Sequence, residues 1–190
     1  MKFSILLRAS TRGVVRSGVR ANEDFRPEHV AAWLVHDEPA LCVVNKPAGV
    51  LSQPGPAGEP DLVTLARAFF GRPTLAVLHR LDRNVSGLVL LAKTAEAARW
   101  LSPQFAAGTV ARAYVAVCRG RIEGDRLTID ASLRKDERSN TVSIAQPGDR
   151  GAQEARTEVE ILERAQGLVG RLSLVRARPI TCLLYTSRCV

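Results

Sequence analysis

Apolar residues in the first half of the chain form short clusters that predict strands and helices. Residues 41–45 are rich in β-branched side chains and predict a buried strand. The sequence Lys-Pro-Ala-Gly at 46–49 predicts a turn, with proline second and glycine fourth. After a Pro- and Gly-rich loop over residues 52–60, Asp61 is expected to cap a helix and Gly71 to end it. The apolar stripe of that helix is Leu62, Leu65, Ala66, Phe69 and Phe70.

Two further short strands are predicted over residues 75–78 and 87–92, and a polar segment separates them. Thr94 is expected to cap a second helix. Its buried face has an apolar residue at every fourth position, namely Ala97, Leu101 and Phe105. Because proline has no amide hydrogen and clashes with the preceding turn, we expect Pro103 to kink or end this helix.

Beyond Gly108 the apolar pattern changes to every second residue, which predicts strands. The gaps between these strands are too short for crossover helices, since a parallel connection needs about a dozen residues or more. We therefore expect antiparallel pairing. The predicted strands are 111–118, 127–131, 141–144, 156–162 and 168–177. The fold class is α+β: a mainly antiparallel mixed β-sheet with a few packed helices.

Composition is that of an ordinary globular protein with a basic balance. The chain has 190 residues, enough for one domain with a hydrophobic core. It carries 27 Lys and Arg against 19 Asp and Glu, so a polyanionic partner such as RNA fits its charge. Its cysteines and histidines show no metal-ligand spacing, and no glycine-rich nucleotide loop is present. We expect no metal ion.

The N-terminal residues 1–28 form a basic arm that we expect to be flexible. Four arginines recur in it at four-residue spacing: Arg8, Arg12, Arg16 and Arg20. An organelle transit peptide and an arm that touches phosphate have the same character. No apolar run approaches the roughly 20 residues that span a bilayer, so we expect no membrane insertion. Cys42 and Cys118 lie in apolar runs, as buried thiols of a reducing compartment do, and we expect a cytoplasmic protein.

The polar segment 79–87, His-Arg-Leu-Asp-Arg-Asn-Val-Ser-Gly, concentrates ionisable groups between two predicted strands. Loops held by rigid strands often carry catalytic groups. Asp82 stands between Arg80 and Arg83, and nearby positive charge favours the ionised form of a carboxyl group. An ionised aspartate can act as a nucleophile or a base. A structural Arg–Asp pair that closes the loop would have the same sequence.

The run 77–94, with His-Arg-Leu-Asp, a short polar link, Ser-Gly and an aliphatic stretch, resembles the signature of the RluA-type family of pseudouridine synthases. Two other segments agree in the right order. Residues 43–49 resemble the first motif of the family, and residues 113–116 resemble its tyrosine-containing strand. The resemblance covers residues 33–181. Val85 departs from it, because the family usually has threonine there, so a hydroxyl is lost.

The resemblance implies an isomerase that converts uridine to pseudouridine in structured RNA, either rRNA or tRNA. In that reaction the N1–C1′ bond breaks, the detached uracil turns, and C5 bonds to C1′. The resemblance implies that this chemistry needs no external cofactor, which agrees with the missing glycine-rich loop and metal spacing. Asp82 matches the catalytic aspartate, which either adds covalently to the nucleoside or assists an elimination. Tyr114 matches the active-site tyrosine that stacks on uracil, and Arg80 matches a residue expected to fill the space of the flipped base.

Three further residues are expected to contact the substrate on the same grounds: His79, Arg83 and Lys46. The contact expected of Lys46 is to phosphate, and a solvated turn lysine is its alternative. We expect the protein to be a monomer.

We predict a catalytic domain over residues 29–181, lacking its C-terminal part, and a tail over 182–190 outside the family pattern. The family continues after its last strand with a Pro-x-Thr-Gly-Arg-x-His-Gln type motif, whose arginine pairs with the catalytic aspartate. Agreement here stops after Thr181. We therefore expect the chain as written to be inactive, since Asp82 lacks that partner. An inactive remnant that only binds RNA is the alternative function.

Two other classes of protein fit less well. A protein kinase would need a glycine-rich loop before His-Arg-Leu-Asp and Asp-Phe-Gly after it, and the chain has neither. A non-catalytic RNA-binding module agrees with the basic charge. The five Phe and two Tyr of the chain are, however, not interleaved with a basic repeat.

Overall fold

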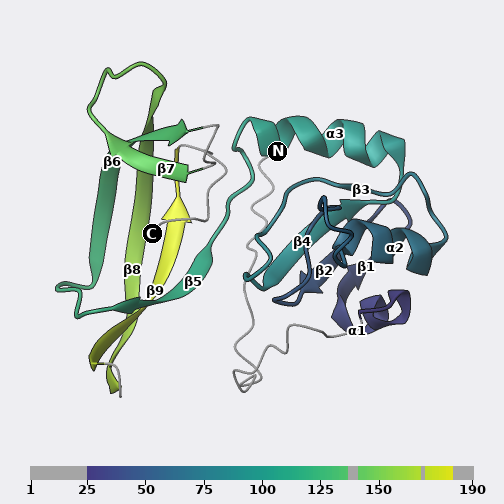
Figure 1. The fold of residues 1–190 in the computed structure, drawn as a ribbon, viewed down its shortest axis with the longest axis horizontal. Coiled ribbons are helices and arrows are strands. Elements are labelled where there is room, and N and C mark those ends of the chain that lie inside the picture. The colour runs from purple at the N-terminus through teal and green to yellow at the C-terminus, as the bar shows by residue number, and fades with distance from the viewer. Residues whose placement is uncertain (1–24, 137–140, 168–169, 182–190) are drawn as a thin grey trace. The chain divides into compact units, whose positions relative to one another are not determined.

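The computed structural model describes residues 25–136, 141–167 and 170–181 (Figure 1). The chain divides into two compact units between Thr109 and Val110, here called the N-terminal and the C-terminal unit. Most of the arm predicted over residues 1–28 lies outside the described residues, and so does the tail 182–190. The described end of the arm is packed: Phe25 meets the ring of Trp33 edge-on, with 5.8 Å between ring centroids.

The N-terminal unit contains a four-stranded antiparallel sheet in the order β1-β2-β4-β3. Its elements are η1 (Pro27–His29), α1 (Val30–Trp33), β1 (Leu34–Asp37), β2 (Leu41–Lys46), α2 (Leu62–Phe70), β3 (Ala76–Val77), β4 (Gly87–Ala92) and α3 (Ala95–Ala106). The sequence pattern predicts β2, β3, β4 and the two longer helices, whereas β1 and the short helical segments are additional to it. No helix of the described residues is long and apolar enough to cross a membrane.

The hydrophobic core lies on one face of this sheet, because side chains alternate along a strand. Cys42 and Val44 of β2 pair with Leu91 and Val89 of β4, and all four side chains are fully buried. They pack against residues of α1 and α2, namely Val30, Leu62, Leu65 and Ala66. Lys46 continues the same two-residue alternation, so its side chain lies on the core face.

Both longer helices begin where the sequence predicts. The carboxylate of Asp61 accepts a hydrogen bond from the amide of Thr64 at 2.9 Å, and the hydroxyl of Thr94 accepts one from the amide of Ala97 at 3.1 Å. Gly71 ends α2 with a φ of 61°, a conformation that residues with a Cβ atom rarely adopt. The caps therefore set these boundaries by local hydrogen bonding.

Of the two effects predicted for Pro103, a kink or an end of the second helix, the end is wrong, because α3 runs on to Ala106. Pro103 lies in the last turn, so the helix loses a single backbone donor there. The carbonyl of Pro103 still accepts a hydrogen bond from the amide of Ala107 at 2.8 Å.

The C-terminal unit contains a five-stranded sheet in the order β5-β9-β8-β6-β7. Its strands are β5 (Tyr114–Arg119), β6 (Arg126–Asp136), β7 (Thr141–Ala145), β8 (Ala152–Gly167) and β9 (Gly170–Pro179). All its strand pairs are antiparallel, as the short connections predict. The α+β class is confirmed. Strands β6 and β8 are longer than predicted.

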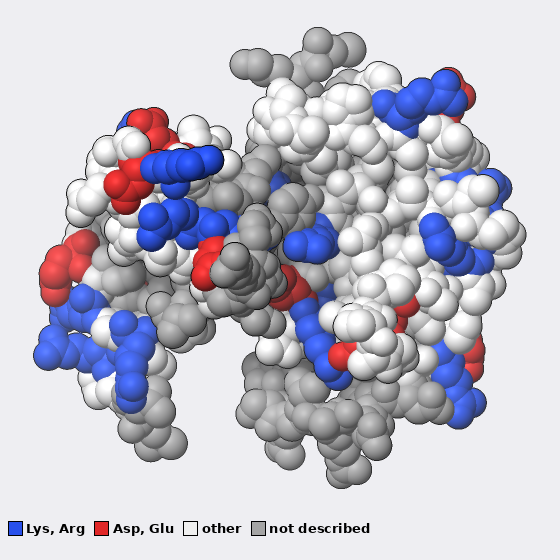
Figure 2. Space-filling model, turned by 45° about the horizontal axis from the view of Figure 1, so that its top comes forward, with Lys and Arg blue, Asp and Glu red and all other residues white. Residues whose placement is uncertain are grey.

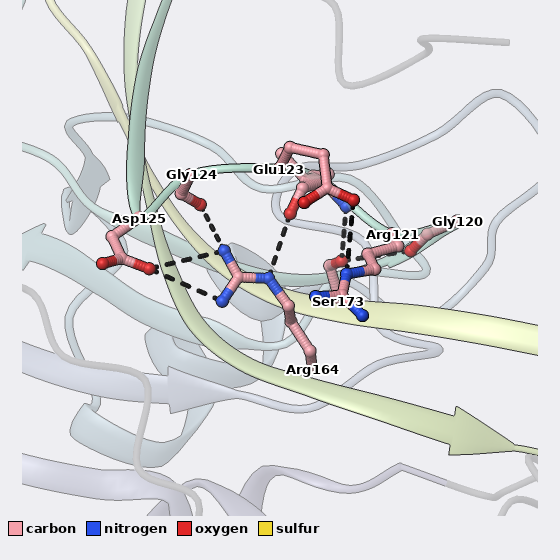
Figure 3. A network of polar contacts seen from close by, with 8 residues as sticks. Gly120, Arg121, Glu123, Gly124, Asp125, Arg164 and Ser173 are labelled. Carbon is pink, nitrogen blue, oxygen red and sulfur yellow. Dashed lines mark hydrogen bonds and ion pairs between the residues drawn. The ribbon is translucent and has the colours of Figure 1, made fainter.

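The connection from β5 to β6 is held in shape by two side chains of the neighbouring strands (Figure 3). Arg164 of β8 donates from Nε to the carbonyl of Ile122 at 3.0 Å and lies 3.4 Å from the carboxylate of Asp125. The hydroxyl of Ser173, a fully buried residue of β9, donates to the carbonyl of Gly120 and accepts from the amide of Ile122. This loop is thus attached to the sheet by specific polar contacts.

The cap of α3 gives a stability test. Replacing Thr94 by alanine leaves the amide of Ala97 without its acceptor, so we expect the free energy of unfolding in urea to fall by about 1 kcal/mol. Ser102→Ala is the control, because it removes a hydroxyl from an exposed position of the same helix. That variant should lose no stability, since alanine favours helix. Equal losses in the two variants would contradict a specific role of the cap.

Candidate functional site

The residues predicted for the site are divided between the two units. The N-terminal unit contains Lys46, His79, Arg80, Asp82 and Arg83. Asp82 lies in the connection between β3 and β4 and is exposed, as is Arg80. Tyr114 belongs to the C-terminal unit, where it is the first residue of β5, is half-buried and pairs with Ala177 of β9.

The backbone on both sides of Asp82 is bound to one short segment. After Asp82, the carbonyl of Arg83 accepts a hydrogen bond from the amide of Gly49 at 2.7 Å, and Arg83 Nε donates to the carbonyl of Gly49 at 3.1 Å. Before Asp82, the amide and the carbonyl of Leu81 are both bound to the hydroxyl of Ser52, at 2.9 and 2.6 Å. The segment from Gly49 to Ser52, which we call the support segment, thus holds the chain around Asp82.

The support segment is itself fixed to the start of α2. The amide of Leu51 donates to the carbonyl of Pro60 at 3.0 Å, and the carbonyl of Leu51 accepts from the amide of Leu62 at 2.8 Å. Gly49 has a φ of 98°, which favours glycine at this point of the turn. A path of backbone hydrogen bonds therefore leads from α2 through the support segment to the neighbours of Asp82.

Lys46 is fully buried, and its amine is satisfied inside the protein. Nζ donates to the carbonyls of Pro47 at 2.9 Å and of Val50 at 2.7 Å. Burial lowers the pKa of Lys46 to about 8, and the nearby carboxylate of Asp82 acts in the opposite direction. This corrects the sequence interpretation: a side chain on the core face is neither a solvated turn lysine nor placed to contact phosphate.

Arg83 is engaged within the loop. Besides Gly49, its guanidinium binds the carboxylate of Glu59, with 3.2 Å between Nη1 and Oε1. The sequence pattern gave no indication of Glu59, which lies 24 residues away along the chain. In this arrangement Arg83 braces the loop that carries Asp82.

His79 is buried, with 8% of its surface exposed. Its ring stacks on Phe105 of α3 with 4.8 Å between ring centroids, and its Nε2 accepts a hydrogen bond from the amide of Leu90 at 3.1 Å. An accepting Nε2 leaves the proton of a neutral ring on Nδ1. These contacts give His79 a structural role, and its burial does not suit the predicted contact with substrate.

The C-terminal unit contains a polar cluster that the sequence does not single out. The carboxylate of Glu160 lies 2.6 Å from Arg176, 3.7 Å from Arg178 and 3.8 Å from Arg126. The hydrogen bond from Arg176 and the surrounding positive charge hold the pKa of Glu160 below its usual range. A surface hollow of about 390 Å³ adjoins this cluster and is lined by Arg126, Leu127, Thr128, Glu158, Val159, Glu160 and Arg178.

In the described residues no group of His, Cys, Asp and Glu side chains is arranged to hold a metal ion.

A titration of the lysines by NMR tests this description of Lys46. We expect its amine to titrate at about pH 8, against 10.5 for an ordinary lysine, and its signal to be absent from Lys46→Met. Because the pKa in the folded state lies below that in the unfolded state, this ionisation makes the free energy of unfolding rise with pH between these two values. Asp82→Asn should lower the pKa of Lys46 further, since the amide no longer stabilises the ammonium.

The control for this titration is Glu38→Gln, which neutralises an exposed carboxylate paired with His36. It should leave the pKa of Lys46 where it is. A Lys46 signal that titrates near 10.5, or that does not respond to the loss of Asp82, would contradict the arrangement.

Two human proteins of known structure have the same fold. RNA Pseudouridylate Synthase Domain Containing 1 superimposes with a TM-score of 0.65 at 26% sequence identity, over 78% of this chain and 59% of its own. RNA Pseudouridylate Synthase Domain Containing 4 also gives a TM-score of 0.65, at 21% identity, over 83% of this chain and 62% of its own.

Curated sequences agree with this likeness. Ribosomal large subunit pseudouridine synthase C of Haemophilus influenzae is 32% identical over 78% of this chain and 45% of its own length. Ribosomal large subunit pseudouridine synthase D of Neisseria meningitidis is 33% identical over 79% of this chain and 41% of its own length. The chain thus spans about half the length of the curated relatives that it matches. Residues 40–184 match the sequence profile described as RNA pseudouridylate synthase, and the chain belongs to this family.

Proposed function

We propose that this chain is the catalytic part of an RNA pseudouridine synthase, in which Asp82 is the catalytic carboxylate. The observation that carries the proposal is the setting of Asp82 within the signature segment. Its carboxylate is exposed, while the residues before and after it are both bound to the support segment. A group that attacks or deprotonates a bound nucleoside needs this combination of access and fixed position.

The proposed reaction rearranges bonds within one nucleoside. Breaking the N1–C1′ bond and forming the C5–C1′ bond is an isomerisation, in which C5 loses a proton and N1 ends up carrying one. Tyr114 is the residue proposed to stack on the uracil, and Arg80 is proposed to take the place of the flipped base. Flipping is required because the reacting atoms are inaccessible in a stacked helix.

The substrate proposed is ribosomal RNA of the large subunit. This rests on the names of the relatives, which are ribosomal large subunit pseudouridine synthases C and D. The charge of the chain agrees with an RNA substrate. On the face shown in Figure 2, Lys and Arg side chains are scattered among Asp and Glu.

The role of Asp82 is tested by Asp82→Asn, which keeps the shape of the side chain but removes its charge. Because we expect the unaltered chain to be inactive, the substitution is made in a chimera in which the residues after Thr181 are replaced by the corresponding segment of the Haemophilus influenzae relative. The substrate is an unmodified large-subunit rRNA transcript with tritium at C5 of uridine, because product formation releases that tritium. We expect no release above background, while the dissociation constant for RNA changes less than about twofold. The matched control is Asp130→Asn, because Asp130 is an exposed aspartate of β6 that lies 3.7 Å from Arg156 of β8. Turnover by Asp82→Asn near the rate of the chimera without this substitution would exclude the assignment.

The alternative, a remnant that binds RNA without modifying it, is tested in the same assay. We expect the unaltered chain to release no tritium, because the arginine expected after Thr181 is missing. A chimera that carries the corresponding segment of the Haemophilus influenzae relative after Thr181 should be active. This expectation concerns residues 182–190, which lie outside the described residues. Equal and measurable rates in chain and chimera would contradict it, whereas RNA binding without measurable turnover in both would favour the remnant. Unmodified transfer RNA is tested as a second substrate in parallel. If transfer RNA reacts and the rRNA transcript does not, the proposed activity is retained and the proposed substrate is wrong.

A further inference from the structure

We propose that Ser52 is a positioning residue for Asp82: its hydroxyl fixes the peptide group that precedes Asp82 and thereby directs the carboxylate toward the substrate. This inference rests on the function proposed for Asp82. Neither the family signature nor the charge pattern points to Ser52, which lies in a Pro- and Gly-rich loop 29 residues before Leu81.

The first observation is that the hydroxyl of Ser52 makes two hydrogen bonds to a single residue. It donates to the carbonyl of Leu81 at 2.6 Å and accepts from the amide of Leu81 at 2.9 Å. Ser52 has 4% of its surface exposed, so water does not replace it. A hydroxyl is a donor and an acceptor at once, and this allows one small side chain to satisfy both polar groups of the residue.

The second observation is that the opposite side of Asp82 is held by the same segment. Gly49 binds the carbonyl of Arg83 through its amide, and its own carbonyl receives the guanidinium of Arg83. Asp82 is therefore held on both sides, through Leu81 before it and Arg83 after it. With the chain fixed before and after it, the Cα–Cβ bond of Asp82 keeps one direction. Loss of the attachment at Ser52 would free the preceding peptide group to rotate.

The third observation is that the two residues before Ser52 are themselves hydrogen-bonded to the rest of the N-terminal unit. Leu51, directly before Ser52, is bound through its amide and its carbonyl to residues at the start of α2. On the other side of Leu51, the carbonyl of Val50 is held by the buried amine of Lys46. The hydroxyl of Ser52 thus connects the loop that carries Asp82 to the core of the N-terminal unit.

The matched pair Ser52→Thr and Ser52→Val isolates the hydroxyl, because threonine and valine have nearly the same shape and only threonine keeps the oxygen. Any cost of the added methyl group in this buried position is common to both variants. Ser52→Ala removes the hydroxyl without adding volume. Unfolding in urea shows which variants are folded at the assay temperature, and only those are compared.

The three substitutions are made in the active chimera, which serves as their parent. There we expect Ser52→Val and Ser52→Ala to lower the turnover rate at saturating RNA by about 10- to 100-fold, the effect of displacing a reacting group by roughly 1 Å. Ser52→Thr should stay within about threefold of the parent. The dissociation constant for RNA should be unchanged in all three variants, because Ser52 is buried. Equal rates in the threonine and valine variants would overturn the proposal, and so would a loss of RNA binding that accounts for the loss of rate.

A second readout separates failure of this inference from failure of the proposed function. The titration of Lys46 senses the carboxylate of Asp82 and requires no catalysis. If Asp82 moves away when the hydroxyl is lost, the pKa of Lys46 in Ser52→Val should fall toward its value in Asp82→Asn, and in Ser52→Thr it should not. Should neither the parent chain nor the chimera convert uridine, this comparison alone decides: a difference between the two variants upholds the positioning role, and identical titrations refute it.

Discussion

The candidate site depends on one constraint, which is that a buried amine must find hydrogen-bond acceptors where water is absent. Strand alternation places Lys46 on the core face of β2, the same face as Cys42 and Val44. The chain meets the constraint by turning back, so that the carbonyls of Pro47 and Val50 receive the amine. That turn also brings the support segment against the neighbours of Asp82. A charge hidden from solvent thus helps to set the position of the carboxylate that is exposed to it.

Local signals were sufficient for much of the N-terminal unit. Asp61, Thr94 and Gly71 act through hydrogen bonds and backbone angles within a few residues, so the helix ends were predictable from the sequence. Burial of Lys46 carried no such signal, because residues 41–44 are all apolar and do not distinguish the two faces of the strand, and the turn that follows suggested exposure. Ser52 and Glu59 carried no local signal, because their partners lie 29 and 24 residues away.

In the C-terminal unit, the sequence predicts the strands but not the register in which they pair. Short connections imply antiparallel strands, and the period of two separates the faces of the sheet. The register does not follow from that pattern, because sliding a strand by two residues preserves every face. The cluster of Arg126 and Arg176 on Glu160 exists only in the register observed, in which these three residues lie opposite one another on β6, β9 and β8. Motif order predicted the importance of Tyr114, but not which residues lie across the sheet from it.

The two backbone hydrogen bonds of Leu51 have a consequence for how the family can diversify. They join the chain before and after residues 53–58, so the ends of this loop are held together whatever its length. For a flexible loop, each doubling in length costs only about 0.6 kcal/mol. Insertions here would leave Ser52 and the attachment of Glu59 to Arg83 in place. The loop can therefore change in length while the support segment and the pair of Arg83 and Glu59 keep their places.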